Sequence, residues 1–343
     1  MTTPFTPDDR TRLAATLGDV IADGATPGGV LVCGTVDDTP QVLTAGVVSA
    51  ETGDQAPGAD TLYDVASLTK VVATWPLVGR AVAAGLLDLD APIRDALPPI
   101  NGEAPSGEAT PRQLLTHTSG LRASTRLDHY RGAAAPLHEL LCREPLDEEP
   151  GHHRYINRGF ILLGLALAHV HGRPLDELAV DMWQQTGMPS TLYGPVARGP
   201  HVAPTEQRIP GAPRIWGAAH DDNAGLLGGV AGHAGVFSSG TDLAAYARHL
   251  LRAHRDGSSA GEWLHASLVP QAPIEPGFDR GLGWIVPAGG AVAYHHGWTG
   301  TSLYLAPATG RYVVLLTNAV YHGQARTRIA PLRTLILKTL STT

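Results

Sequence analysis

Residues 64–70 read DVASLTK and place a serine three positions before a lysine. On a helix, Ser67 and Lys70 would lie on the same face, within reach of one another. Asp64 precedes them at a position where it could cap the turn. Only two lysines, Lys70 and Lys338, occur in the 343 residues, whereas arginine supplies the rest of the basic charge. The stretch is therefore either a capped helix with an incidental lysine or a site where an amine activates a serine.

The pair has a specific chemical use. A serine hydroxyl is a weak nucleophile until a neighbouring base accepts its proton, and a desolvated lysine can be that base, whereas arginine cannot. A serine near a helix amino terminus also lies among unpaired backbone N–H groups, which favour a developing negative charge. The SxxK pattern is common by chance, and scarce lysine is also typical of a GC-rich genome. The pattern alone leaves both alternatives open.

Composition excludes several other classes of protein. The formal charge is −7, from 25 basic and 32 acidic residues, and no basic stripe exists, so nucleic acid is not an expected partner. Cys33 and Cys142 lie in apolar surroundings, which predicts buried thiols rather than a disulfide. No apolar run is long enough for a membrane span and no leader-like amino terminus is visible, so we expect a cytoplasmic protein without a membrane partner.

Hydrophobic periodicity predicts the order of the elements. Helical spacing is expected over 8–23, over 71–89 directly after Lys70, over 241–254 behind Thr241 as a cap, and over 325–340. The runs GGVLVCGTV and QVLTAGVV, separated by DDTP, predict a hairpin. Further strand-like runs are GLGWIVP, AVAYHH, TSLYLAP and RYVVLLTN.

This order predicts an α/β (α+β) fold with strands from both ends of the chain. We expect 1–65 and 241–343 to form a mixed α/β domain and 66–240 to form a mainly helical domain. The active site would lie at their junction.

Two later segments could complete a site. In PGHHRYINRGFILLG, Tyr155 could relay a proton and Asn157 could bind a substrate amide or ester. Alternatively, Tyr155 packs on the following helix and Asn157 caps it. In AYHHGWTGTSLYL, a strand that ends at His295 would present a histidine toward a cleft, and Gly297 would let substrate approach the backbone. The alternative is an ordinary strand end with solvated histidines.

Together the segments resemble a known family. The order SxxK, YxN and then HxG is similar to that of the serine β-lactamase and penicillin-binding-protein superfamily, in particular its class C-like esterase branch. The resemblance extends to LLTHTSGL (114–121), HDDNAGLLGGVAGHAGVFSS (220–239), GLGW (281–284) and HHGWTGT (295–301). These segments follow the family's order across roughly residues 25–320.

The resemblance implies a serine β-lactamase-like fold, an antiparallel sheet flanked by helices plus a helical domain. It implies that Ser67 is the acylated nucleophile and Lys70 its activating partner. Tyr155 would be the proton-relaying tyrosine, and Asn157 would orient the substrate.

On the opposite side of the site, the resemblance implies that His295 takes the first position of the KTG-like triplet. The backbone N–H groups of Ser67 and Trp298, with Gly297 beside them, would form the oxyanion hole. The lysine expected there in β-lactamases and D-Ala-D-Ala peptidases is replaced by His295. This departure predicts slow turnover of β-lactams, and the bulk of Trp298 predicts a narrow acyl site.

The predicted function is hydrolysis of a small-molecule ester or amide through an acyl-serine intermediate. The alternative is a transacylase of specialised metabolism that passes the acyl group to an alcohol or amine. A non-catalytic binding protein on the same fold is less favoured. So is a metallohydrolase, because the histidines lack HxH or HExxH spacing; they include His152, His153, His220 and His233. No metal and no cofactor are expected.

Overall fold

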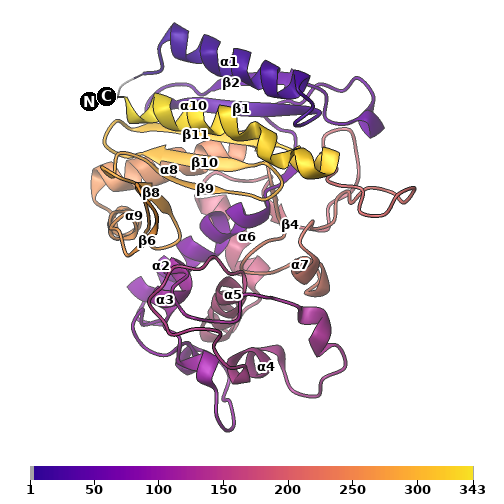
Figure 1. The fold of residues 1–343 in the computed structure, drawn as a ribbon. Coiled ribbons are helices and arrows are strands. Elements are labelled where there is room, and N and C mark those ends of the chain that lie inside the picture. Colours follow the sequence, from indigo (N-terminus) through magenta and orange to yellow (C-terminus); the bar gives the residue numbers. More distant parts are fainter. Residues whose placement is uncertain (1–3, 343) are drawn as a thin grey trace.

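The computed structural model describes residues 4–342, apart from the side chains of 324–326. Its largest element is an antiparallel sheet of eight strands in the order β2-β1-β11-β10-β9-β8-β7-β6 (Figure 1). The strands are β1 (Gly28–Thr35), β2 (Gln41–Gly46), β6 (Ala272–Glu275), β7 (Phe278–Arg280), β8 (Ile285–Pro287), β9 (Ala293–His296), β10 (Ser302–Ala306) and β11 (Arg311–Thr317). Because β1 pairs with β11, the two ends of the chain meet in the middle of one sheet.

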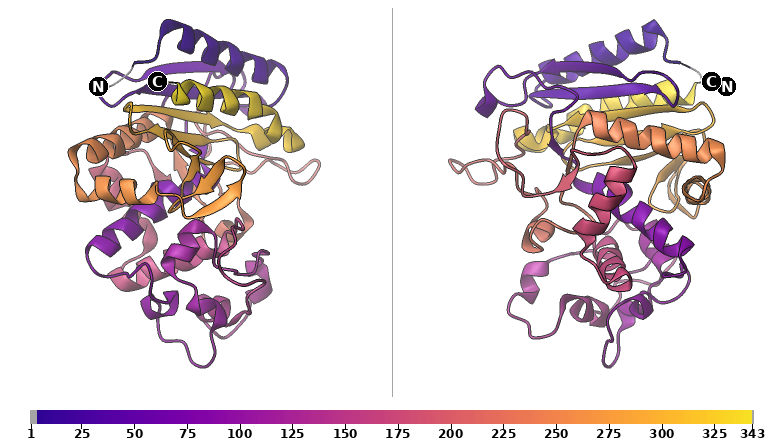
Figure 2. Two further views of the ribbon diagram at one scale, coloured as in Figure 1. Left: turned by 60° about the vertical axis from the view of Figure 1, so that its left-hand side comes forward. Right: turned by 180° about the vertical axis from the view of Figure 1, so that it is seen from behind.

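The central strands are buried on both faces. Successive side chains of a strand point to opposite faces, so β1 contributes Val30 and Val32 to one apolar core and Leu31 and Cys33 to the other. Helices α1 (Pro7–Ala22) and α10 (Ala330–Ser341) cover the second face, whereas α8 (Gly240–Asp256) packs on the first (Figure 2). This double burial explains why β1 reads as a nearly continuous apolar run.

The middle of the chain is mainly helical and packs against the first face of the sheet (Figure 1). Its helices, with α9 that follows α8, are α2 (Trp75–Ala83), α3 (Pro111–Thr116), α4 (Leu137–Arg143), α5 (Arg158–His171), α6 (Leu175–Gln185), α7 (Asp222–Leu226) and α9 (Ser259–Ser267). A small sheet in the order β3-β5-β4 joins the two parts; its strands are β3 (Tyr63–Asp64), β4 (Leu192–Tyr193) and β5 (Val236–Ser238).

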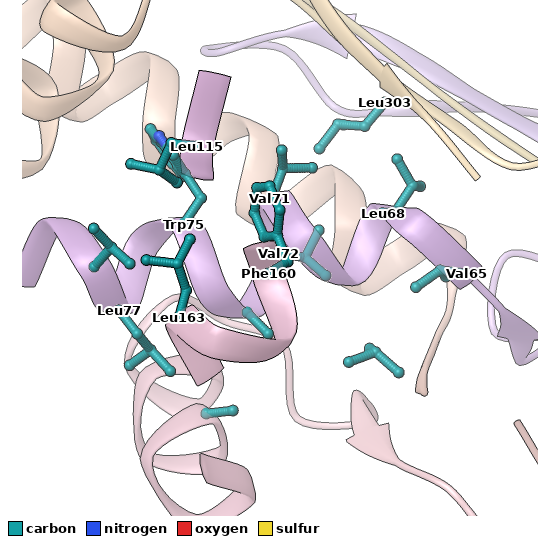
Figure 3. Close-up of a cluster of buried hydrophobic side chains, with 14 of the residues drawn as sticks. Val65, Leu68, Val71, Val72, Trp75, Leu77, Leu115, Phe160, Leu163 and Leu303 are labelled. Carbon is teal, nitrogen blue, oxygen red and sulfur yellow. The ribbon is translucent and has the colours of Figure 1, made fainter. Parts of the chain in front are cut away.

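One buried helix carries the DVASLTK stretch through the core. It starts as a short 3₁₀ turn (Ala66–Leu68), continues as a π-helical turn (Lys70–Thr74) and ends as α2. Val71, Val72 and Trp75 lie among the apolar side chains that include Phe160 of α5 (Figure 3). Apolar packing thus fixes the helix rigidly behind its two polar residues.

Most expected elements are present. The helix over 8–23, the hairpin around DDTP, the four later strands and the buried free thiols are all confirmed. The final helix is confirmed too, although α10 begins later than expected. Three details differ. Ser239, not Thr241, caps α8; the helix after Lys70 ends at Ala83; and the short strands β6 and β7 were not expected.

The domain boundaries stay a prediction, and residues 1–3 and 343 of the expected α/β domain lie outside the described residues. None of the helices in the described part of the chain has the length and apolar character that a membrane span needs. The expected location and the expected partners likewise stay predictions.

Candidate active site

A strained turn presents Ser67. Ala66 has a φ of 48°, a left-handed conformation that costs a non-glycine residue about 1–2 kcal/mol. The Asp64 carboxylate accepts a hydrogen bond from the Ala66 N–H at 2.7 Å and so holds the turn. The prediction that Asp64 caps the turn is wrong in detail, because Val65 takes the N-cap position and Asp64, one residue earlier, holds the turn through the Ala66 N–H. The turn leaves Ser67 partly exposed at the start of an otherwise buried helix.

Lys70 is fully buried and donates three hydrogen bonds from Nζ. The acceptors are Ser67 Oγ at 2.9 Å, Asn157 Oδ1 at 2.9 Å and the His233 carbonyl oxygen at 3.1 Å. Asn157 is the residue before α5, yet its side chain makes no capping bond to that helix. Of the two alternatives for Asn157, the structure therefore favours a role in the site.

Tyr155 lies beside this amine, with Lys70 Nζ 5.1 Å from the centroid of its ring. The ring packs on His117 at a centroid distance of 4.4 Å, and 43% of the residue's surface is exposed. His117 has a left-handed backbone, and its Nδ1 accepts a hydrogen bond from the Ile156 N–H. Tyr155 is thus held by its neighbours while one side stays open to solvent.

The end of β9 closes the site from the sheet. A Cβ on Gly297 would lie 2.3 Å from the Val65 carbonyl oxygen, so only glycine allows this close approach. The side chains of Thr299 and Thr301 donate to the carbonyl oxygens of Asp64 and Val65. These contacts fix the turn after β9 against the turn that carries the nucleophile.

The structure brings together the residues predicted from the sequence. His295 is buried on β9, with its ring 6.3 Å from that of Tyr155, and Trp298 follows Gly297 with 54% of its surface exposed. Figure 1 shows β9 in the sheet above α5, so the sheet and the helices supply residues to the site from opposite sides. The chemical roles that the resemblance implies for these residues stay predictions.

Sequence reasoning missed one important charge, Arg280. This residue ends β7 and is 2% exposed, and its guanidinium carbon lies 5.8 Å from the Tyr155 ring. Its Nε–H donates to His153 Nε2 at 3.4 Å and its Nη1 to the Gly283 carbonyl oxygen at 3.5 Å. A signal was present, because Arg280 directly precedes the GLGW segment that carries part of the resemblance.

Burial and Arg280 together keep the nearby histidines neutral. Burial lowers the pKa of His295 and of His117 well below the ordinary value, and the Arg280 charge lowers both further. The same two causes lower the pKa of His153 to about 4. Burial lowers the pKa of Arg280 itself to about 10, so it stays charged at neutral pH. The sheet side of the site is therefore positive through one arginine rather than through protonated histidines.

The other histidines do not converge. Among the described residues, no group of three or more His, Cys, Asp or Glu side chains could hold a metal ion. His220 contacts Glu206, whereas His233 contacts Asp221.

Comparison with known proteins agrees with this geometry. The family model described as Beta-lactamase matches residues 13–338, nearly the whole chain. The chain belongs to the beta-lactamase family. A curated relative, a putative D-alanyl-D-alanine carboxypeptidase of Escherichia coli (strain K12), is 30% identical over 81% of this chain and 72% of its own length. The chain is therefore a hydrolase of the beta-lactamase family.

Solved structures show the shared fold. The D-alanine carboxypeptidase AmpC from Burkholderia cenocepacia is 20% identical, with a TM-score of 0.73 over 97% of this chain and 99% of that one. EstCE1, a hydrolase with promiscuous acyltransferase activity, is 18% identical, with a TM-score of 0.69 over 95% and 99%. The fold of this beta-lactamase-family chain is the serine β-lactamase and penicillin-binding-protein fold, as the sequence predicted.

Proposed function

We propose that this chain is a serine hydrolase that cleaves a small-molecule ester or amide through an acyl-Ser67 intermediate. The observation that carries the proposal is the 2.9 Å contact between Ser67 Oγ and the buried Lys70 Nζ. A buried amine loses its proton more readily than a solvated one, and a neutral amine at this distance can accept the serine proton. The contact therefore supplies the activation that a serine nucleophile requires.

The proposed reaction has two halves. Lys70 accepts the Ser67 proton while Ser67 Oγ attacks the substrate carbonyl carbon. The resulting oxyanion would be stabilised by the backbone N–H groups of Ser67 and Trp298. Collapse of this intermediate breaks the ester or amide bond, and the leaving alcohol or amine receives a proton by way of Tyr155. Water then attacks the acyl carbon and gives a proton to Lys70, the bond from the acyl carbon to Ser67 Oγ breaks, the proton passes to Ser67 Oγ, and the carboxylic acid leaves.

Two exposed residues favour water as the acceptor. Tyr155 and Trp298 are 43% and 54% exposed, so solvent reaches this side of the site at these two residues. Transfer to an alcohol or amine remains the alternative to hydrolysis. Either acceptor would use the same acyl-enzyme.

The charge of Arg280 supports an anionic substrate. A buried guanidinium beside Tyr155 and His153 is screened little by water, so it acts on a bound carboxylate over several ångströms. The name of the Escherichia coli relative, a putative D-alanyl-D-alanine carboxypeptidase, supports the same direction, because such a substrate ends in a carboxylate. We therefore propose amides or esters whose leaving group or acyl group bears a negative charge.

Covalent labelling tests the proposal. A fluorophosphonate probe should label the wild-type protein at Ser67, and p-nitrophenyl acetate or butyrate should be hydrolysed. The Ser67→Ala variant should lose labelling and at least about 10⁴-fold in turnover, because no other group can carry the acyl chain. Dipeptides that end in D-alanine, with and without alcohol or amine acceptors, would distinguish amide from ester and hydrolysis from transfer.

The matched control is Ser190→Ala, which removes the hydroxyl of an exposed serine. The backbone N–H of Ser190 donates to Asp242, which is not one of the hydrogen-bond partners of Lys70. It should label and turn over as the wild type does. An acyl or phosphonyl adduct on the Ser67→Ala protein, detected by intact mass, would contradict the assignment of the nucleophile.

A further inference from the structure

The loop that ends at His233 touches the proposed catalytic lysine, although none of its side chains does so. His233 gives only its carbonyl oxygen to Lys70. Its ring is fully buried, and Nε2 lies 2.7 Å from the Asp221 carboxylate. The same carboxylate oxygen accepts the Ala224 N–H at 2.9 Å at the start of α7. The HDDN and GHAG segments of the sequence thus meet beside Lys70.

The protonation states of this pair are settled by its surroundings. Burial lowers the pKa of His233, and the bond to Asp221 only partly opposes this effect. Burial would raise the pKa of Asp221, but its hydrogen bonds to His233 and to the Ala224 N–H outweigh this effect and lower the pKa below its usual range. His233 Nδ1 has no hydrogen-bond partner in the described structure, as suits a neutral ring protonated on Nε2. The pair therefore carries one net negative charge.

The three partners of Lys70 have unequal chemistry. The Asn157 Oδ1 and the His233 carbonyl oxygen can only accept hydrogen bonds, whereas the Ser67 hydroxyl can accept or donate. A neutral amine has two N–H bonds and one lone pair. When the two pure acceptors take both N–H bonds, the lone pair is left for the Ser67 proton.

We propose that the Asp221–His233 pair is a positioning unit for Lys70, in which the carboxylate holds His233 so that its carbonyl oxygen directs the amine's lone pair at Ser67. This inference rests on the proposed function. Asp221 touches no reacting atom and acts through His233. The unit also places a negative charge near the lysine.

A second, neutral anchor holds the same loop. The Thr74 hydroxyl donates to the Gly232 carbonyl oxygen at 2.6 Å. A Cβ on Gly232 would lie 2.1 Å from the Phe160 carbonyl oxygen, so the chain fits tightly against α5. Thr74 and Gly232 fix where the loop lies, whereas Asp221 fixes the His233 ring and supplies the charge. The two contributions can therefore be separated by experiment.

Other titratable groups also act on Lys70, and the variants compared must leave these groups unchanged. Its charge interacts with Asp221 and with three histidines from three different segments, namely His233, His117 and His295. The ring of Tyr155 faces it as well. Of these groups only Asp221 carries a negative charge near neutral pH. Removing that charge therefore makes the surroundings of Lys70 more positive.

The experiment compares Asp221→Asn with Asp221→Ala. Asparagine keeps an acceptor for His233 and for the α7 cap but removes the charge. Removing a negative charge beside the site disfavours the protonated form of the site. We expect the acidic limb of kcat/KM for p-nitrophenyl butyrate to move down by about one pH unit, with activity at the optimum within about tenfold. Asp221→Ala should lose roughly 10–100-fold in kcat, because His233 loses its partner.

Asp222→Asn is the matched control, since Asp222 is the adjacent acid and its side chain is 80% exposed. Its pH profile should coincide with that of the wild type. Circular dichroism checks the folding of each variant. The pH dependence of fluorophosphonate labelling at Ser67 provides a second readout that needs no substrate.

The outcomes separate the two proposals. Wild-type labelling and turnover together with an Asp221→Ala kcat within a few fold of the wild type would overturn the positioning unit and leave the serine hydrolase intact. Absence of wild-type labelling at Ser67 would overturn both proposals.

Discussion

The two sides of the candidate active site, called here the helical wall and the sheet wall, hold their buried basic residues in different ways. On the helical wall, Lys70 has three oxygen acceptors within 3.1 Å. On the sheet wall, Arg280 has hydrogen bonds of only 3.4 and 3.5 Å, to a histidine nitrogen and a carbonyl oxygen. Among the described residues, no acidic side chain forms a salt bridge with either of them. One wall therefore fixes the direction of an amine, whereas the other maintains a positive field.

The difference fits the tasks that we propose for the two groups. A proton acceptor must point at its donor within a few tenths of an ångström, and oriented neutral acceptors achieve this without cancelling the chemistry of the amine. A group that attracts an anion needs charge rather than direction, and a carboxylate beside it would cancel that charge. The loose contacts of Arg280 suit this second task.

The largest loss of turnover in this comparison is expected for variants of Lys70, on the helical wall. Lys70→Arg keeps the charge but removes the base, because a guanidinium does not lose its proton near neutral pH. We expect turnover of p-nitrophenyl butyrate to fall by roughly 10²–10⁴-fold, and Lys70→Ala to be at least as damaging. Steady-state hydrolysis of both variants, with folding checked by circular dichroism, measures this.

A rival mechanism makes the opposite prediction for the same variants. If Tyr155 were the base, as a phenolate held by a positive Lys70, arginine should retain much of the activity that alanine loses. Activity of Lys70→Arg within a few fold of the wild type would show that Lys70 is an electrostatic partner only.

An Arg280 variant should separate stability from recognition. Arg280→Met removes a buried charge that has no acidic partner, so we expect the thermal midpoint to stay level or to rise by a few degrees. At the same time KM for an anionic ester should rise about tenfold, and that for neutral p-nitrophenyl acetate should change little. Differential scanning calorimetry and steady-state kinetics measure the two effects.

Arg12→Met is the control, because Arg12 lies on α1 with 57% of its side chain exposed. It should leave both KM values unchanged. Equal losses for anionic and neutral esters in Arg280→Met would instead make Arg280 a structural residue and would remove the argument for an anionic substrate.

The smallest expected effect concerns acid stability. The pKa of His153 is lowered from its ordinary value of 6.5 to about 4, so between these values the unfolded chain binds a proton that the folded chain does not. The contribution of His153 to the free energy of unfolding should therefore be fully present above about pH 6.5 and should decline as the pH falls toward 4. His117 and His295, whose pKa values are also lowered, act in the same direction.

Thermal midpoints measured between pH 4 and 8 would show this decline. In Arg280→Met one cause of the lowered pKa values is absent, so the decline should be shallower than in the wild type. An identical slope in both proteins would mean that burial alone depresses these histidines.

The sequence by itself determined the local part of the site. Ser67 and Lys70 meet because a spacing of three residues on one helical stretch brings them together whatever the rest of the chain does. The hairpin of β1 and β2 was also predicted, from two strand-like runs separated by DDTP. The placement of Tyr155, Asn157 and His295 came from the resemblance to a family rather than from local geometry.

Only the tertiary structure decided the rest. The third acceptor of Lys70 is the backbone carbonyl of His233. Every residue carries such a group, so no side-chain pattern can predict this contact. Arg280 reaches the site because β7 pairs with β8 and β8 pairs with β9. The register of such strands is set by the packing of the whole sheet rather than by local sequence. Asn157 could also be interpreted as a helix cap, and its contact with Lys70, which is far away in the sequence, favours a role in the site.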